Sequence, residues 1–167
     1  MNAVWTSLVA VLGTLAGGGL TATLQGRLAR ANRREARRAD ALAAVTQLAA
    51  ALANHRRAMW VVEDRRLSGA PEQAVDEAQT KRHDTRAAIE IPLQTVAILV
   101  PALAQPAEEA TRATFAMRNV ADHDTLTTLR QAAKDAHGRF VAAARVIFAD
   151  MGDSVTRDKA VEPAVTS

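Results

Sequence analysis

The sequence contains no cysteine and no tyrosine, and aromatic residues make up only 3% of its 167 positions. The absence of cysteine excludes disulfide bridges and thiolate metal sites. Alanine instead fills roughly a fifth of the chain. Alanine, Leu, Arg, Glu and Gln favour helices, and Ala is disfavoured in strands. The composition therefore predicts an all-α protein, and the sequence shows neither an internal repeat nor a strand pattern.

Charged residues are absent from Met1 to Gly26. An apolar helix of ~20 residues spans the hydrocarbon core of a bilayer, and Trp5 stands where an interfacial aromatic residue belongs. The three glycines at 17–19 lower both the helix propensity and the hydrophobicity of this stretch. No positive charge precedes it, which argues against a cleaved signal peptide. We predict a transmembrane anchor over residues 1–25, the alternative being a buried helix of a soluble protein.

A cluster of arginines follows the apolar stretch at Arg27, Arg30, Arg33, Arg34, Arg37 and Arg38. Basic residues beside a span mark its cytoplasmic end. We therefore expect a single-pass cell-membrane protein with its N-terminus outside and its bulk in the cytoplasm. These six arginines face two carboxylates within residues 1–40, whereas the rest of the chain has 15 Lys and Arg against 16 Asp and Glu. The basic charge thus belongs to a juxtamembrane stalk, residues 26–40, where it sets topology and can also contact anionic lipid.

Two features of the predicted span and stalk bear on partners. Gly13 and Gly17 form a G-x-x-x-G pair, a spacing that lets membrane helices approach closely and dimerise. The expected partners are the lipid bilayer, a second copy of the chain and an unidentified protein. Nucleic acid is a disfavoured partner, because arginines lying against a membrane leave a duplex little access.

Helical periodicity predicts that the chain continues into a cytoplasmic antiparallel bundle of about four helices over residues 41–151. The first helix ends at Ser68-Gly69-Ala70, and the second runs from Pro71 towards Val100 with a kink at Pro92. A third covers 106–120. The apolar stripes of the bundle are clearest on two helices. On the first helix the stripe is Leu42, Val45, Ala49, Leu52, Met59 and Val62, and on the fourth it is Leu126, Leu129, Ala133, Ala136, Phe140, Ala143 and Ile147. The fourth stripe is heptad-like, as in a coiled coil.

The fourth helix is expected to begin after Asp122 as its N-cap and to end at Met151, because Gly152 follows. The segment 152–167 lacks apolar periodicity and is predicted to be a disordered tail.

No residue set in the chain indicates catalysis, a cofactor or a metal. The four histidines are not spaced as metal ligands, and Asp122-His123-Asp124 is better explained as a helix-capping turn than as a ligand set. The adjacent carboxylates at 63–64 and 108–109 point to different helix faces. Neither a phosphate-binding loop nor a nucleophile motif is present. An enzyme is therefore disfavoured.

The segment His55 to Trp60 is the most unusual part of the predicted bundle. Arg56 and Arg57 lie three or four residues from Trp60, a spacing at which a guanidinium can stack on an indole. These three residues form a candidate partner surface. The alternative makes Trp60 a core residue with both arginines solvated.

Three segments carry a resemblance to a known family: VLGTLAGGGLTATLQ, then RRADALAAVTQLAAALANHRRAMW, then EDRRLSGA. The chain resembles the KilB-type proteins of actinobacterial conjugative plasmids and integrated elements, most densely over residues 11–70. The resemblance implies a small membrane-associated protein involved in plasmid spread through streptomycete mycelium. It implies no catalytic or binding residue.

Together these observations predict a non-enzymatic membrane-anchored scaffold or adaptor in the intramycelial spread of a conjugative element. One alternative is a membrane-perturbing toxin or holin-like oligomer acting through the glycine-rich span. The other is a membrane-proximal nucleic-acid-binding module.

Overall fold

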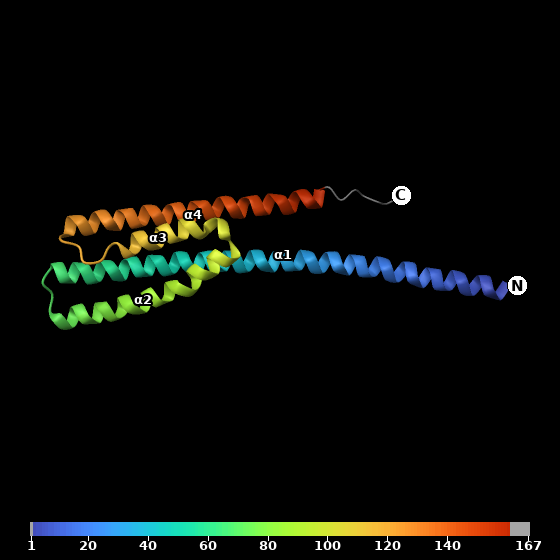
Figure 1. Ribbon diagram of the computed structural model, residues 1–167, viewed down its shortest axis with the longest axis horizontal. Coiled ribbons are helices and arrows are strands. Elements are labelled where there is room, and N and C mark those ends of the chain that lie inside the picture. Colours follow the sequence, from blue (N-terminus) through green and yellow to red (C-terminus); the bar gives the residue numbers. More distant parts are fainter. Residues whose placement is uncertain (1, 161–167) are drawn as a thin grey trace. The chain divides into compact units, whose positions relative to one another are not determined.

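The computed structural model describes the backbone of residues 2–160 and the side chains of residues 25, 26 and 28–151. Its elements are α1 (Asn2–Leu67), α2 (Glu72–Leu99), the short 3-10 helix η1 (Pro101–Leu103), α3 (Ala104–Phe115) and α4 (His123–Ala160) (Figure 1). The chain divides into two units, residues 1–40 and 41–167. The prediction of an all-α protein whose four helices pack as a bundle is confirmed.

The predicted anchor over residues 1–25 has its side chains, up to residue 24, outside the described part of the chain. Among the described residues, no helix has the length and apolar character needed to cross a membrane.

A Schellman motif ends α1. The N–H of Ala70 donates to the carbonyl of Arg65 at 2.9 Å and that of Gly69 to Arg66 at 3.3 Å. Gly69 has φ +66°, a left-handed conformation that glycine adopts without the steric cost of a Cβ. Pro71 then accepts the first bonds of α2, from Ala74 and Val75, so it precedes the helix by one residue rather than opening it.

The other observed helix boundaries agree only in part with those predicted from the sequence. The α2 helix passes through Pro92 without a break and bends in its C-terminal half (Figure 1). Asp122 caps α4 as predicted, since its Oδ1 accepts the N–H of Thr125 at 2.7 Å. Helix α3 ends at Phe115 rather than at Val120, because the chain turns at Asn119, where φ is +55°.

The predicted end of the fourth helix at Gly152 is wrong, because α4 continues to Ala160. A single glycine inside a helix costs only about 1 kcal/mol relative to Ala. It ends a helix only when the backbone adopts the left-handed conformation. The remaining part of the predicted tail, residues 161–167, lies outside the described residues.

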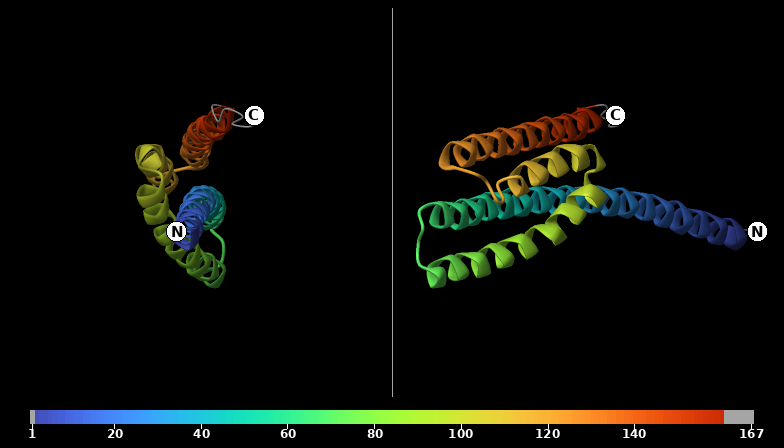
Figure 2. Two further views of the ribbon diagram at one scale, coloured as in Figure 1. Left: turned by 90° about the vertical axis from the view of Figure 1, so that its right-hand side faces the viewer. Right: turned by 60° about the vertical axis from the view of Figure 1, so that its left-hand side comes forward.

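The bundle core follows a heptad on the 41–67 part of α1. Buried positions there recur with alternating spacings of four and three: Ala41, Val45, Leu48, Leu52, His55, Met59 and Val62. The predicted core residue Leu42 is 53% exposed, because Ala41 takes the core position at this end of the stripe. The views in Figure 2 show α2 and α4 on opposite sides of this part of α1.

Two hydrophobic clusters make up the core. The larger joins all four helices around Phe140, Leu48, Leu52, Ile89, Val96 and Leu103. The smaller contains Met59, Met117, Val120, Leu126 and Ala133. On α4, Leu126, Ala133, Ala136 and Phe140 are buried as predicted, whereas Leu129, Ala143 and Ile147 are half-buried. The heptad-like stripe of α4 therefore does face the core.

Candidate functional site

The predicted membrane-facing residues fall into two groups. The side chains of Gly13, Gly17 and Arg27 lie outside the described residues. Of the other cluster members, Arg30, Arg33, Arg34 and Arg37 are exposed and Arg38 is half-buried. Within this segment, Arg33 Nε donates to the carbonyl of Ala29 at 3.0 Å.

The structure separates the three residues of the candidate partner surface. Trp60 is half-buried and packs against the smaller core cluster. The guanidinium over its ring belongs to Arg130 of α4, whose Cζ lies 4.3 Å from the ring centroid. Arg57 is exposed and lines a groove of about 390 Å³ with Ala78, Lys81 and Thr85 of α2. Arg56 and Arg57 therefore lie on different faces of α1, one towards α4 and the other towards α2.

The α1–α4 side of the bundle contains two buried polar atoms that have no hydrogen-bond partner, Arg56 Nη1 and His137 Nδ1. Burial lowers the pKa of Arg56, and Arg130 lowers it further. Burial also lowers the pKa of His137, with Arg56 as the second cause. Among the residues that the structure describes, neither Arg56 nor Arg130 lies within ion-pair distance of an acidic side chain, which is unfavourable for folding.

His55 occupies a core position of the α1 heptad and is 1% exposed. Its Nδ1 lies 3.0 Å from Thr85 Oγ1 of α2. The Thr85 hydroxyl also lies 3.0 Å from the carbonyl of Arg82 and 3.1 Å from that of Lys81. Because a carbonyl can only accept, the hydroxyl donates to the backbone and accepts from the imidazole. This arrangement places the imidazole proton on Nδ1.

The imidazole of His55 also lies edge-on to Phe115 of α3, with ring centroids 5.2 Å apart. Burial is the main reason why the pKa of His55 falls from 6.5 to about 4, and the nearby Arg86 and Arg82 lower it further. His55 is therefore uncharged near neutral pH.

Beside His55 opens a pocket of about 80 Å³. Its wall contains three arginines, Arg82, Arg86 and Arg118, and we call it the arginine pocket. His55, Met59, His83 and Phe115 complete the lining. The Cζ of Arg86 lies 4.7 Å from the centroid of the Phe115 ring, a cation–π contact. No sequence motif indicated this pocket, because its members come from three helices and the α3–α4 connection, and its arginines look like ordinary surface positions along the chain.

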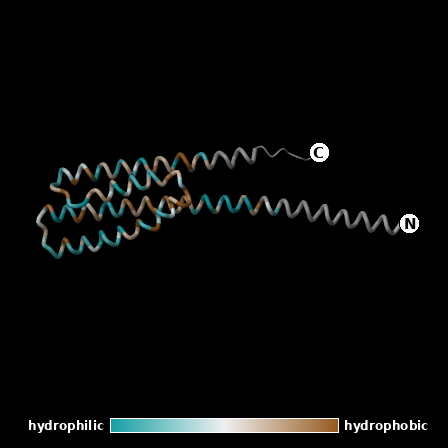
Figure 3. Tube along the Cα trace, in the orientation of Figure 1, coloured by the Kyte–Doolittle hydropathy of each residue, from teal (hydrophilic) through white to brown (hydrophobic). Residues whose placement is uncertain are grey.

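A second unpredicted feature is an apolar stripe on the solvent face of α2. We define the α2 stripe as Ala88, Ile91, Thr95, Ile98 and Leu99. Ile91 and Ile98 are 75% and 76% exposed. The Thr95 hydroxyl donates to the carbonyl of Ile91 at 2.8 Å, so its polar group is satisfied within the helix. Figure 3 shows the hydrophobic character of this part of α2.

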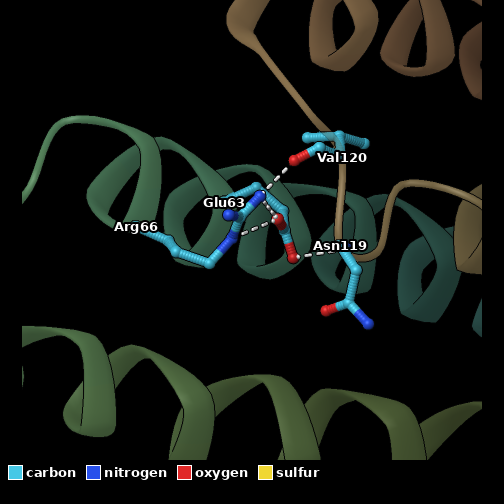
Figure 4. A network of polar contacts seen from close by, with 4 residues as sticks. All are labelled: Glu63, Arg66, Asn119 and Val120. Carbon is cyan, nitrogen blue, oxygen red and sulfur yellow. Dashed lines mark hydrogen bonds and ion pairs between the residues drawn. The ribbon is translucent and has the colours of Figure 1, made fainter.

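The end of α1 is tied to the α3–α4 connection by a buried carboxylate (Figure 4). Glu63 is 1% exposed, and its Oε1 accepts the backbone N–H of Asn119 at 3.0 Å. Its Oε2 accepts Arg66 Nε at 3.0 Å, and Arg66 Nη2 also donates to the carbonyl of Val120. We assign this network a structural role, because its hydrogen bonds join the end of α1 to the backbone of the turn at Asn119 and Val120. The next residue, Asp64, lies instead at the surface, 3.4 Å from His123 Nε2.

Within the described residues, no group of three or more His, Cys, Asp or Glu side chains is arranged to hold a metal ion. The Asp122 carboxylate is used as a helix cap, and its interaction with the N–H of Thr125 lowers its pKa. The predicted role of Asp122 as the N-cap of α4 is therefore confirmed.

From residue 41 to residue 151 the chain is thus a small helical bundle with an exposed apolar stripe on α2 and a pocket lined by three arginines. Residues 42–148 match the family described as KilB plasmid transfer protein. Protein KilB of Streptomyces lividans is 53% identical over 139 residues, which make up 83% of this chain and 95% of that protein. The chain belongs to the KilB plasmid transfer protein family, which confirms the resemblance seen in the sequence. No solved structure matches it.

Proposed function

We propose that this plasmid transfer protein is a membrane-anchored, non-enzymatic adaptor whose helical bundle recruits another transfer protein through the α2 stripe. The observation that supports this function is the exposure of Ile91 and Ile98, one heptad apart on the same face of α2. Large aliphatic side chains that gather on one exposed face are typical of interaction sites. Covering each of them would contribute about 1.5–3 kcal/mol to association.

The spacing of the stripe indicates what kind of partner it takes. Ala88, Ile91, Thr95 and Ile98 are separated by three, four and three residues, the spacing of a helix–helix seam. Asp84 precedes the stripe on the same face, and Gln94 lies at its edge. The occupant that fits is therefore an amphipathic helix, which lays its own apolar face along about three turns of α2.

The anchor and its orientation belong to the same proposal. An uncharged apolar stretch followed by six arginines supports a single span with the bundle in the cytoplasm. Gly13 and Gly17 support self-association within the span, separate from the partner surface on α2. The adaptor would then be held at the membrane by residues 1–25 and would present the α2 stripe to its partner from the cytoplasmic side.

A photocrosslinking experiment tests the adaptor. A photoreactive residue replaces Ile98 in the full-length protein, expressed in membranes of its native host with the conjugative element present. The matched control places the same residue at Val146 of α4, which is 62% exposed but lies beside Arg145 and Asp150 rather than in a stripe. We expect position 98 to give an adduct with another transfer protein and position 146 to give none.

Two results would overturn the proposal. Equal adducts from both positions would show that α2 has no special surface. An adduct only between two copies of the chain would make the α2 stripe a homodimer interface instead of a recruitment site.

A further inference from the structure

The arginine pocket has a composition that the adaptor function does not require. Arg82 and Arg86 stand one turn apart on α2, and Arg118 follows α3. No carboxylate is among the lining residues. In the part of the chain that the structure describes, none of the three guanidinium groups lies within ion-pair distance of an acidic side chain. Positive charge thus converges on a concave site without a counter-charge from the protein.

The shape of the pocket distinguishes it from a solvated basic surface. Its lining joins the buried His55 and Met59 and the half-buried Phe115 to the exposed Arg86 and Arg118. A site of this size has room for several water molecules, since one water needs about 10–15 Å³ on this measure, and about 80 Å³ is present. A ligand in it would be partly removed from solvent, and charge-assisted hydrogen bonds are stronger there than on an open surface.

One arginine is held in position before any ligand binds. The guanidinium of Arg86 lies 4.7 Å from the Phe115 ring, and Phe115 in turn contacts the edge of His55. A stacked guanidinium keeps its N–H donors in the plane around it, which suits a multidentate oxyanion. His55 lines the pocket and keeps the proton on Nδ1 for Thr85, so a second proton taken up at Nε2 would let the imidazolium donate to a phosphate oxygen.

From this geometry we propose that the arginine pocket binds phosphate, either free or as the phosphate group of a small molecule or lipid head group. Three guanidinium groups match the charge of a doubly ionised phosphate better than that of a single carboxylate. The pocket is a small concavity rather than an extended basic groove, which favours a compact ligand over a nucleic-acid backbone. The phosphate could come from free phosphate, a nucleotide or a lipid head group, because all three present the same oxygens.

The experiment is a titration of full-length protein in nonionic detergent, with its four histidines labelled for NMR. The probes are inorganic phosphate, adenosine monophosphate and glycerol 3-phosphate, each compared with chloride at equal ionic strength. We expect a saturable shift of the His55 signal with at least one probe. Bound phosphate also raises the pKa of His55 from about 4, because a negative charge favours the imidazolium.

Four variants make the result specific. Arg82→Gln, Arg86→Gln and Arg118→Gln are each expected to weaken binding by about tenfold or more, since each removes a charge-assisted hydrogen bond. Arg139→Gln is the matched control, because Arg139 is exposed on α4 and does not line the pocket. It removes the same charge and should leave binding unchanged. Circular dichroism confirms that each variant retains its helices.

The ranking of the probes identifies the source of the phosphate. Tighter binding of the nucleotide, of glycerol 3-phosphate or of neither supports a nucleotide, a lipid head group or free phosphate, respectively. The proposal is overturned if all probes act like chloride, or if the three pocket variants bind as well as wild type. It is also overturned if short duplex DNA shifts the His55 signal when no small probe does.

Discussion

Stability at mildly acidic pH depends on His55, and the size of the effect follows from its burial. The imidazole is uncharged in the folded protein because its pKa is lowered from 6.5 to about 4. In the unfolded chain the same group takes up a proton as the pH falls through 6.5. The unfolded state therefore binds more protons between these values, and the free energy of unfolding decreases as the pH falls from about 6.5 to about 4.

The change in pKa sets an upper limit on how much free energy of unfolding is lost over this pH range. A pKa lowered from 6.5 to about 4 corresponds to roughly 3 kcal/mol, at about 1.36 kcal/mol for each pKa unit. Because the arginine pocket opens beside His55, solvent can screen the charged imidazole, so we expect about 2 kcal/mol. His137 acts in the same direction, because its pKa is also lowered, mainly by burial.

The assay is urea unfolding of the full-length protein, followed by circular dichroism at several values between about pH 7 and pH 4. His55→Gln stays uncharged throughout and keeps an amide donor for Thr85, so it should lose about 2 kcal/mol less than wild type over this range. His83→Gln is the control, because His83 is exposed on α2. Equal losses in wild type and His55→Gln would refute the argument that His55 is buried and neutral.

Four further substitutions test other parts of the bundle by the same unfolding assay. Glu63→Ala should cost about 2 kcal/mol, because it removes the buried carboxylate that accepts the N–H of Asn119 and the guanidinium of Arg66; a cost below that of an ordinary surface change would contradict this role of Glu63. Gly138→Ala should raise the free energy of unfolding by about 1 kcal/mol, because Ala favours a helix more than Gly does. Gly69→Ala should lower it by about 1 kcal/mol, because a Cβ is strained at positive φ. A Cβ at either position meets no atom within 4 Å, but Gly69 alone has a positive φ. Arg56→Met should leave stability unchanged or raise it by about 1 kcal/mol, because it removes a buried donor that has no partner, and a clear loss would show that this guanidinium has a compensating anion.

Much of the bundle could be predicted from local sequence. The turn at Ser68-Gly69-Ala70, the Asp122 cap and most of the α1 and α4 stripes each depend on residues within about one heptad of one another. Such signals are visible in a single sequence because periodicity and capping are local. The end of the third helix was mispredicted, because Asn119 turns the chain with help from Glu63, which is 56 positions away.

The candidate site was harder to predict, since it depends on how separate helices meet. The sequence placed Arg56, Arg57 and Trp60 together, whereas packing divides them between two faces of α1 and sets Arg130 on the indole. The C-terminal half of α2 contains several Ile, Leu and Val residues, but their order along the chain does not show which of them are buried. Only the packed bundle shows that one face, with Ile89 and Val96, is buried while the opposite face stays in solvent.

The most direct test of the adaptor account is the efficiency of plasmid transfer in a host that carries charged substitutions in the α2 stripe. Ile91→Glu and Ile98→Glu place a carboxylate where the partner helix would lie, and Val146→Glu makes the same change on α4. With equal protein levels, we expect each stripe variant to reduce transfer by about tenfold, the effect of losing roughly 1.4 kcal/mol of binding. The α4 variant should transfer like wild type. Normal transfer by both stripe variants would contradict recruitment through α2.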